Sequence, residues 1–156
     1  MMIRVEAAER KHIPQIISLW HELMEYHATL DPLFETRQEG ANNWERYIRD
    51  LMRMREGKVF IALKDDEVIG YSVCKVSAHP PLFKQEYYGL IMDMAVKQGY
   101  QRQGTGTMLL ESIYDWAHKM GLNRIELQVV PQNSQGYAFW KKHSFTDYLH
   151  SLYKMI

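Results

Sequence analysis

The chain has 156 residues, of which 46% are hydrophobic, and its 19 basic residues balance its 19 acidic residues. This length suits one core, so we predict a single domain over residues 1–156. A neutral chain lacks the positive field that draws proteins to nucleic acid or anionic membranes, and we expect neither as a partner. Cys74 is the single cysteine, and charges from Arg4 to Lys11 interrupt any export signal, which favours the cytoplasm.

Apolar periodicity predicts a strand, two helices and a hairpin in the first half of the chain. The strand alternates apolar and polar residues, whereas the helices place apolar residues at three-to-four spacing. Asn43 is expected to cap the second helix and Gly57 to end it. The predicted elements are strand 3–6, helix 12 to about 27, helix 43–57 and a β-hairpin over 58–78 around Asp65 and Asp66.

The second half alternates strands with helices. A mostly apolar strand, "GLIMDMAV", precedes a helix that begins near Gly104 and is capped by Gly121. The predicted elements are strand 89–96, helix 104–121, strand 123–130, a short helix over 133–144 and one or two closing strands over 145–156. This order predicts an α/β fold in which one mixed central sheet is flanked by helices on both faces.

The stretch "QRQGTG", residues 101–106, lies between a predicted strand and a predicted helix. Glycines here leave a run of backbone N–H groups open at the positive end of the helix dipole, which suits a phosphate. The pattern is not a P-loop, and it is not the dinucleotide motif, because Leu109 stands where the third glycine belongs. We predict that Gly104 and Gly106 cradle a phosphate group.

The same stretch fits the pattern Gln/Arg-x-x-Gly-x-Gly/Ala, follows a strand that ends in "MAV", and precedes "NSQGYAFWKKHSF" further along the chain. In these segments the sequence resembles the GNAT family of N-acetyltransferases, in an order that spans nearly the whole chain. The resemblance implies a GNAT-like fold, acetyl-CoA as co-substrate, and transfer of its acetyl group to an amine.

The resemblance also implies a coenzyme site. The strand at 92–96 would splay from the strand at 126–130, so that the pantetheine arm enters as a pseudo-strand and a free backbone N–H bonds the thioester oxygen. The loop at 101–107 would hold the diphosphate, with Arg102 near the 3′-phosphate. The expected coenzyme residues are Met94, Ala95, Val96, Gln101, Arg102, Gln103, Gly104, Thr105, Gly106, Thr107, Asn133, Tyr137 and Trp140.

Asp93 is an acid inside an otherwise apolar strand. A charge there is costly unless it is paired or used, and burial would raise its pKa toward that of a useful base. Asp93 is therefore a candidate to accept the amine proton or to bind the amine. A structural hydrogen bond or ion pair is the alternative.

The family's usual general acid is a tyrosine in the last helix, and the matching residue here is Trp140. An indole has no proton to give to a thiolate. Tyr137, one turn earlier, is therefore the candidate catalytic acid, with water as the alternative, and packing or coenzyme contact as the alternative role for Tyr137.

The first helix ends in a polar cluster, where the resemblance places one wall of the acceptor site. Glu25, Tyr26 and His27 are the candidate substrate-binding residues, and an acidic wall would suit a cationic amine. A solvated helix face is the alternative explanation. No histidine pair has the spacing of a zinc site with a carboxylate partner, and we predict no metal.

Together these features predict direct acetyl transfer from acetyl-CoA to a primary amine in a ternary complex, with a small-molecule amine as acceptor. The alternatives are a protein N-terminal or lysine acetyltransferase and a non-catalytic acyl-CoA binding module. The closing segment carries apolar residues on both faces, so its strand is also expected to pair with a second copy in a homodimer.

Overall fold

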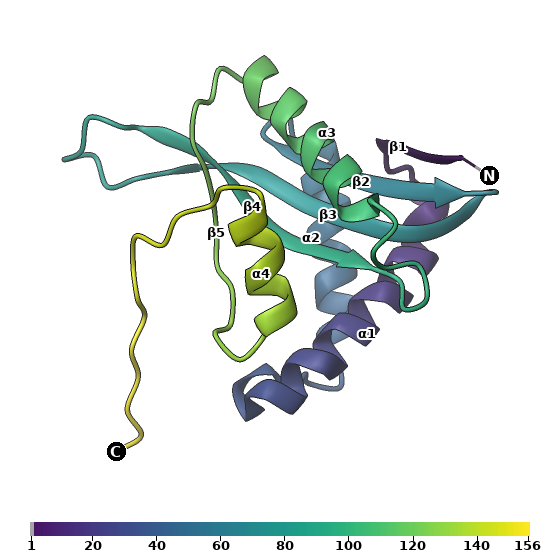
Figure 1. Ribbon diagram of the computed structural model, residues 1–156, viewed down its shortest axis with the longest axis horizontal. Coiled ribbons are helices and arrows are strands. Elements are labelled where there is room, and N and C mark those ends of the chain that lie inside the picture. Colours follow the sequence, from purple (N-terminus) through teal and green to yellow (C-terminus); the bar gives the residue numbers. More distant parts are fainter. Residues whose placement is uncertain (1) are drawn as a thin grey trace.

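Figure 1 shows the computed structural model, which describes residues 2–156 as a five-stranded sheet with helices on both faces. The predicted α/β architecture is therefore confirmed. The strands are β1 (Ile3–Ala7), β2 (Gly57–Lys64), β3 (Glu67–Ala78), β4 (Tyr87–Val96) and β5 (Ile125–Leu127). The α-helices are α1 (Ile13–Leu30), α2 (Gly40–Arg53), α3 (Thr105–Lys119) and α4 (Ser134–Lys142).

The strands lie in the order in which they occur in the chain. β1 to β4 pair antiparallel with their neighbours, and β2 joins β3 through a tight turn at Asp65 and Asp66, both at positive φ. The chain then crosses one face of the sheet as α3 and returns as β5, which must therefore run parallel to β4. This change of direction between β4 and β5 is where the candidate site lies.

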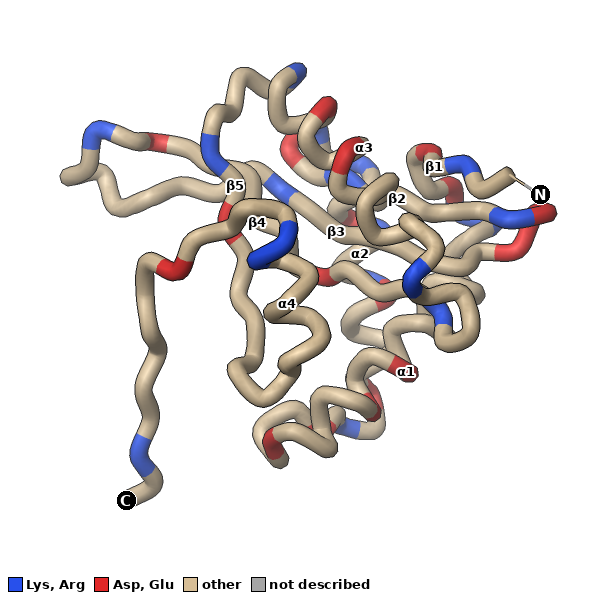
Figure 2. Tube along the Cα trace, in the orientation of Figure 1, with Lys and Arg blue, Asp and Glu red and all other residues tan. Residues whose placement is uncertain are grey.

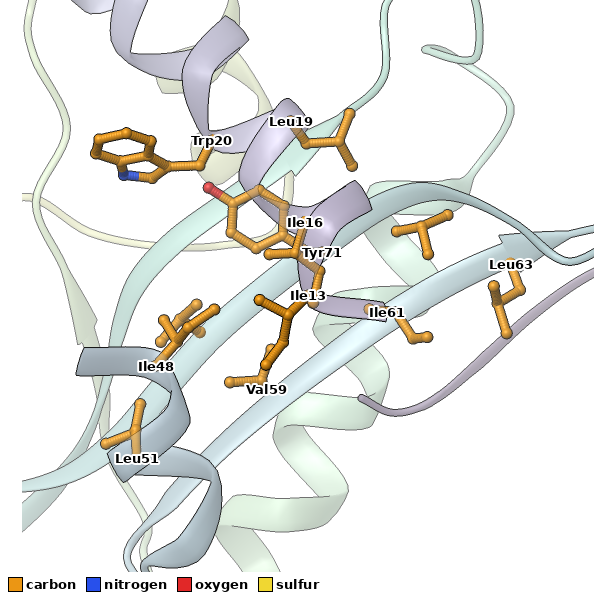
Figure 3. Close-up of a cluster of buried hydrophobic side chains, with 12 residues drawn as sticks. Ile13, Ile16, Leu19, Trp20, Ile48, Leu51, Val59, Ile61, Leu63 and Tyr71 are labelled. Atoms are coloured by element: carbon orange, nitrogen blue, oxygen red, sulfur yellow. The ribbon is translucent and has the colours of Figure 1, made fainter. Parts of the chain in front are cut away.

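Two apolar cores lie on opposite faces of the sheet because successive strand residues point to opposite sides. On β2, Val59, Ile61 and Leu63 join α1 and α2 in one core, whereas Phe60 and Ala62 join α3 in the other. Figure 3 shows the first core, where side chains of α1, α2 and the sheet meet around Tyr71. The near-continuous apolar sequence of β2 and β3 is explained by this burial on both faces.

Several predicted boundaries differ from the structure. Helix α2 begins at Gly40, with Glu39 in the cap position, so Asn43 lies inside the helix and is not its N-cap. The strand predicted over 123–130 is confined to Ile125–Leu127. The closing strands predicted over 145–156 are wrong, because no residue of that segment is in a helix or strand. Alternating apolar residues favour an extended chain, but a strand also needs a neighbouring strand to pair with, and this segment has none among residues 2–156.

The last residues leave the body of the protein as an extended tail (Figure 1). Its start is fixed by side chains: Tyr137 Oη donates to Asp147 Oδ2 at 2.8 Å, and Tyr148 donates to Glu126 on β5. The Arg124 guanidinium lies 4.9 Å from the centre of the Tyr148 ring. Beyond this point the apolar side chains are exposed, namely Leu149, Leu152, Tyr153, Met155 and Ile156.

Basic and acidic residues are interspersed over the fold, and Figure 2 shows no region of the chain given over to one sign of charge. Within residues 2–156, no helix is both long enough and apolar enough to cross a bilayer.

Candidate active site at the splayed β4–β5 pair

A β-bulge in β4 decides where Asp93 points. Val73 of β3 lies opposite Asp93 and Cys74 opposite Ile91, so Met92 is an extra residue in β4. Ile91 belongs to the core under α3, and Met92 packs against the core under α1 and α2. Without the bulge Asp93 would return to the α3 face, but the extra residue leaves it on the same face as Met92, beside Trp44 of α2.

Asp93 is partly buried, and this environment changes its acidity. Burial raises the pKa of Asp93 to about 7, whereas a hydrogen bond from the Trp44 side chain acts in the opposite direction. Burial and then the nearby Asp93 carboxylate raise the pKa of Tyr71 well above its usual value. Near neutral pH Asp93 is thus poised to exchange a proton, while the Tyr71 phenol stays neutral.

β4 and β5 pair over only three positions, from Gly89–Ile125 to Ile91–Leu127. Past that point β4 continues to Val96, but the chain after β5 leaves the sheet. Lys97 N–H donates to Ile69 O on β3, and successive N–H groups of a strand point to opposite edges. The N–H groups of Met94 and Val96 therefore point to the side that β5 has left, whereas that of Ala95 points to β3.

The loop before α3 presents a second set of N–H groups. Gly104 is the N-cap of α3 with φ of 84°, a left-handed conformation that favours glycine, and a Cβ there would meet no atom within 4 Å. Thr105, Gly106 and Thr107 form the first helical turn, where N–H groups have no intrahelical partner. The first partner is made by Met108 N–H, which donates to Gly104 O. Open space and free donors therefore coincide at this helix terminus.

The second glycine of the motif also has a packing role that the sequence did not predict. A Cβ on Gly106 would lie 3.1 Å from the Phe139 ring of α4, so this glycine allows α4 to pack closely on α3. Thr107 Oγ1 lies 3.2 Å from His143 Nε2 and joins the same two helices. The Thr105 side chain is buried and its hydroxyl has no hydrogen-bond partner among residues 2–156. Of the two motif glycines, Gly104 alone combines positive φ with open space.

The polar residues before Gly104 shape the loop. The Gln101 side-chain amide donates to Val96 O at 3.2 Å and ties the loop to the end of β4. Arg102 is exposed and takes a positive φ of 63°, a conformation that non-glycine residues rarely adopt. Gln103 is exposed. The loop is thus held at one end by Gln101 and leaves Arg102 accessible to an anion.

Helix α4 brings the predicted coenzyme and acceptor residues together. Asn133 caps α4 by accepting from Gly136 N–H at 3.0 Å, and its side-chain oxygen also accepts from Tyr26 Oη of α1 at 3.2 Å. Trp140 is partly buried, with its ring 5.3 Å from that of Phe145. Helix α1 and the start of α4 therefore meet at the Tyr26–Asn133 hydrogen bond.

Tyr137 is engaged elsewhere. Its hydroxyl bonds both oxygens of Asp147, at 3.0 and 2.8 Å, and this bond raises the pKa of Tyr137.

On the α1 side, Glu25 is exposed, and burial lowers the pKa of His27, whose ring lies 5.4 Å from that of Phe34. This lowered pKa favours the neutral form of the His27 side chain.

Sequence reasoning missed three residues that the structure places at the site. Trp44 and Tyr71 border Asp93, and His143 contacts the first turn of α3. Trp44 lies in the second predicted helix and Tyr71 in the predicted hairpin, and both elements form. The available signal was Asp93 itself, because a carboxylate in an apolar strand needs donors, and tryptophan and tyrosine supply them from otherwise apolar side chains.

One surface cavity lies away from these residues. It has a volume of about 530 Å³ and is lined by residues such as Lys84, Tyr87 and Leu122, between the β3–β4 connection and the turn after α3. None of its lining residues belongs to the predicted site, and we assign it no part in the chemistry.

Comparison with known proteins decides the family. The model of the acetyltransferase (GNAT) family matches residues 17–145, which span the helices, the splayed strands and the glycine loop. The chain belongs to the GNAT acetyltransferase family. The predicted resemblance is thereby confirmed.

Relatives within and around this family differ in kind. N-alpha-acetyltransferase 30 of Schizosaccharomyces pombe is 27% identical over 89 residues, and the match spans 57% of this chain and 57% of that protein. A tetramutant of the BH1408 protein from Bacillus halodurans has the same fold, with a TM-score of 0.87 and 19% identity over all of both chains. An aminoglycoside N-acetyltransferase, AAC(6')-Iy, solved with CoA, has a TM-score of 0.78 and 12% identity over 99% and 95% of the two chains.

Proposed function

We propose that this protein is an acetyl-CoA-dependent N-acetyltransferase that transfers the acetyl group directly to a primary amine in a ternary complex. The observation that carries the proposal is the position of Asp93. The bulge at Met92 sets a carboxyl with a pKa of about 7 beside the point where β4 and β5 separate. Amine acetylation requires a base that can take up a proton near neutral pH, and Asp93 lies where β4 and β5 separate.

The residues present fit the coenzyme. Gly104 offers open space at the N-terminus of α3, where the N–H groups of Thr105, Gly106 and Thr107 point out of the first turn and suit a diphosphate. The N–H groups of Met94 and Val96 face the side that β5 has left, where an extended pantetheine arm can add as a strand. The bound coenzyme would supply the acetyl thioester.

Asp93 and a backbone N–H of β4 then carry out two steps of the transfer. Asp93 accepts a proton from the ammonium form of the acceptor, which frees the nitrogen lone pair for attack on the thioester carbon. The N–H of Met94 or Val96 donates to the thioester oxygen as negative charge develops on it. The nitrogen then gives up its second proton to water, and the thiolate that departs takes up one proton from water. The CoA thiol has an acidity near that of cysteine, so its thiolate can leave without a protein acid. Because its hydroxyl is held by Asp147, we assign Tyr137 at most a small share as acid.

Direct transfer is preferred to a covalent acetyl-enzyme. Cys74 is fully buried on β3, and burial raises the pKa of its thiol to about 12. A thiol of that kind supplies almost no thiolate at neutral pH. The acceptor must therefore reach the thioester itself, between α1 and the open end of β4.

A small-molecule amine is the favoured acceptor. Tyr26 bonds Asn133 at the start of α4, and Glu25 beside it on α1 is exposed and would suit a cationic amine. An aminoglycoside N-acetyltransferase, which is named for small-molecule amine substrates, has the same fold. The match to the N-alpha-acetyltransferase of Schizosaccharomyces pombe favours a protein N-terminus as the second candidate. A non-catalytic acyl-CoA binding module is the third, supported by Trp140 at the family's acid position.

The test is release of free CoA thiol from acetyl-CoA against a panel of aminoglycosides, polyamines and peptides with free N-termini. Turnover with small amines supports the first proposal, and turnover with peptides alone supports the second. Coenzyme binding without turnover of any amine in the panel would support the third candidate, the non-catalytic acyl-CoA binding module.

A further inference from the structure

The Tyr71 hydroxyl is a polar group that the proposed mechanism does not use. Tyr71 comes from β3, its side chain is fully buried, and its hydroxyl makes no direct hydrogen bond within residues 2–156. Buried polar groups in folded proteins nearly always have a partner. Phenylalanine would fill the same space without this requirement, so the hydroxyl itself calls for an explanation.

Tyr71 and Asp93 share one face of the sheet. Tyr71 pairs with Ala95 across β3 and β4, two residues from Asp93, and the bulge turns the Asp93 side chain to the α1 and α2 side. Figure 3 shows Tyr71 rising from the sheet within the core on that side, with its hydroxyl at the far end. The carboxylate of Asp93 is the charge that acts on the phenol.

Trp44 links these two residues. Its ring meets that of Tyr71 edge to face, with centroids 5.8 Å apart and planes at 72°, and its side chain is the donor that lowers the pKa of Asp93. The Trp20 ring stacks on Trp44 at 5.2 Å and closes the cluster from α1. A carboxylate among aromatic rings has few donors available, so each one has a large effect on its ionisation and orientation.

We propose that Tyr71 is a positioning residue for Asp93, whose carboxylate it holds by donating a hydrogen bond through one buried water. Two polar groups that lack a direct bond and face the same interior region can share such a water, which is nearly as favourable as a direct bond. Trp44 and Tyr71 then donate to the ionised form and keep the carboxylate directed at the amine. The inference rests on the proposed role of Asp93 as base.

The experiment measures the pKa of Asp93 directly, by NMR titration of its ¹³Cγ signal in the free protein, with Asp93→Asn to assign the signal. In Tyr71→Phe the loss of one hydrogen bond to the carboxylate should raise the pKa of Asp93 by about 0.5–1 unit. Tyr114→Phe is the matched control, because Tyr114 lies on α3 and packs against the core on the opposite face. It should leave the pKa of Asp93 unchanged.

Kinetics provide the second readout. The acid limb of kcat/KM should move upward by the same interval in Tyr71→Phe, with a loss of about 2- to 5-fold at pH 7 that recovers at pH 9, while affinity for acetyl-CoA stays the same. Packing alone would not move this limb. An unchanged pKa of Asp93 in folded Tyr71→Phe would overturn the proposal.

Two further outcomes are decisive. If Tyr71→Phe fails to fold, 3-fluorotyrosine can be placed at position 71, because it keeps the shape of tyrosine and is a stronger hydrogen-bond donor. This substitution should lower the pKa of Asp93. An unchanged pKa of Asp93 would count against the proposal. If the NMR shift appears but no amine is acetylated, the positioning of Asp93 by Tyr71 stands and the proposed enzymatic function fails.

Discussion

At the scale of single residues, Met92 has the largest consequence for the site. It is the extra residue of the β4 bulge, and without it Asp93 would enter the core under α3. The sequence predicted that Asp93 is either used or paired, because an acid in an apolar strand is expensive. It could not predict the bulge, since no glycine or proline marks it and the register of β3 against β4 creates it.

The raised pKa of Asp93 predicts a pH-dependent cost to stability. A carboxyl with a pKa of about 7 in the folded state and near 4 in the unfolded state favours folding at low pH, and this contribution is lost as the pH rises through 7. Asp93→Asn removes the cost of the buried charge. We expect the variant to be more stable than the wild type by roughly 2–4 kcal/mol at pH 8, at about 1.4 kcal/mol per pKa unit.

Urea unfolding at pH 8 and at pH 4 measures this difference. The gain of Asp93→Asn should be present at pH 8 and nearly absent at pH 4, where both forms are neutral at this position. Asp115→Asn, on the exposed side of α3, is the control and should show little gain at either pH. A wild type as stable as Asp93→Asn at pH 8 would show that the Asp93 charge is fully compensated.

At the scale of elements, the sequence predicted the helices better than their ends. Apolar spacing identified α1, α2 and α3, and the glycine loop marked the start of α3. The start of α2 was missed because Asn43 is a good cap by type, but the helix already begins at Gly40. Helix ends depend on tertiary packing as well as on local preference, which explains this error.

The N-terminus of α3 yields a prediction with a matched control. Gly104 and Gly121 both have positive φ, 84° and 75°, and a Cβ on either would meet no atom within 4 Å. Alanine at either position should therefore cost a similar amount of stability, about 1–2 kcal/mol, from backbone strain. Only Gly104→Ala places a methyl group beside the free N–H groups of the first turn of α3.

Calorimetry with acetyl-CoA distinguishes the two variants. Gly104→Ala should weaken binding at least about 10-fold, whereas Gly121→Ala should bind like the wild type. Equal affinities in Gly104→Ala and Gly121→Ala would place the diphosphate away from this helix terminus.

At the scale of the whole molecule, the extended tail favours a second copy. Residues 149–156 expose a series of apolar side chains, and the side of β5 opposite β4 pairs with no strand among residues 2–156. Asp147 and Tyr148 fix the start of the tail, so it leaves the body in one direction. We expect two copies to exchange tails reciprocally across a two-fold axis.

Light scattering at micromolar concentration tests this dimer. The full chain should have the mass of a dimer, and removal of residues 149–156 should give a folded monomer. Leu152→Asp should weaken the dimer, whereas Leu82→Asp, at another exposed leucine on the β3–β4 connection, should not. A full chain with monomer mass would refute the expectation.

The candidate site could be predicted in its chemistry but not in its contacts. The motif and the lone acid identified the loop and Asp93, because both depend on local sequence. Trp44 and Tyr71 come from α2 and β3, and their approach to Asp93 depends on how those elements pack. The packing role of Gly106 was not predicted for the same reason, because Phe139 is far away in sequence.

The most direct test is the pH profile of acetyl transfer to an amine that the protein acetylates, with the acetylated product measured by mass spectrometry. For the wild type, kcat/KM should rise tenfold per pH unit below about pH 7 and level off above it, as Asp93 loses its proton. Asp93→Asn should lose roughly 10²-fold in kcat/KM and this limb, with affinity for acetyl-CoA kept. An unchanged profile in a folded Asp93→Asn protein would contradict the account and return Asp93 to a structural role.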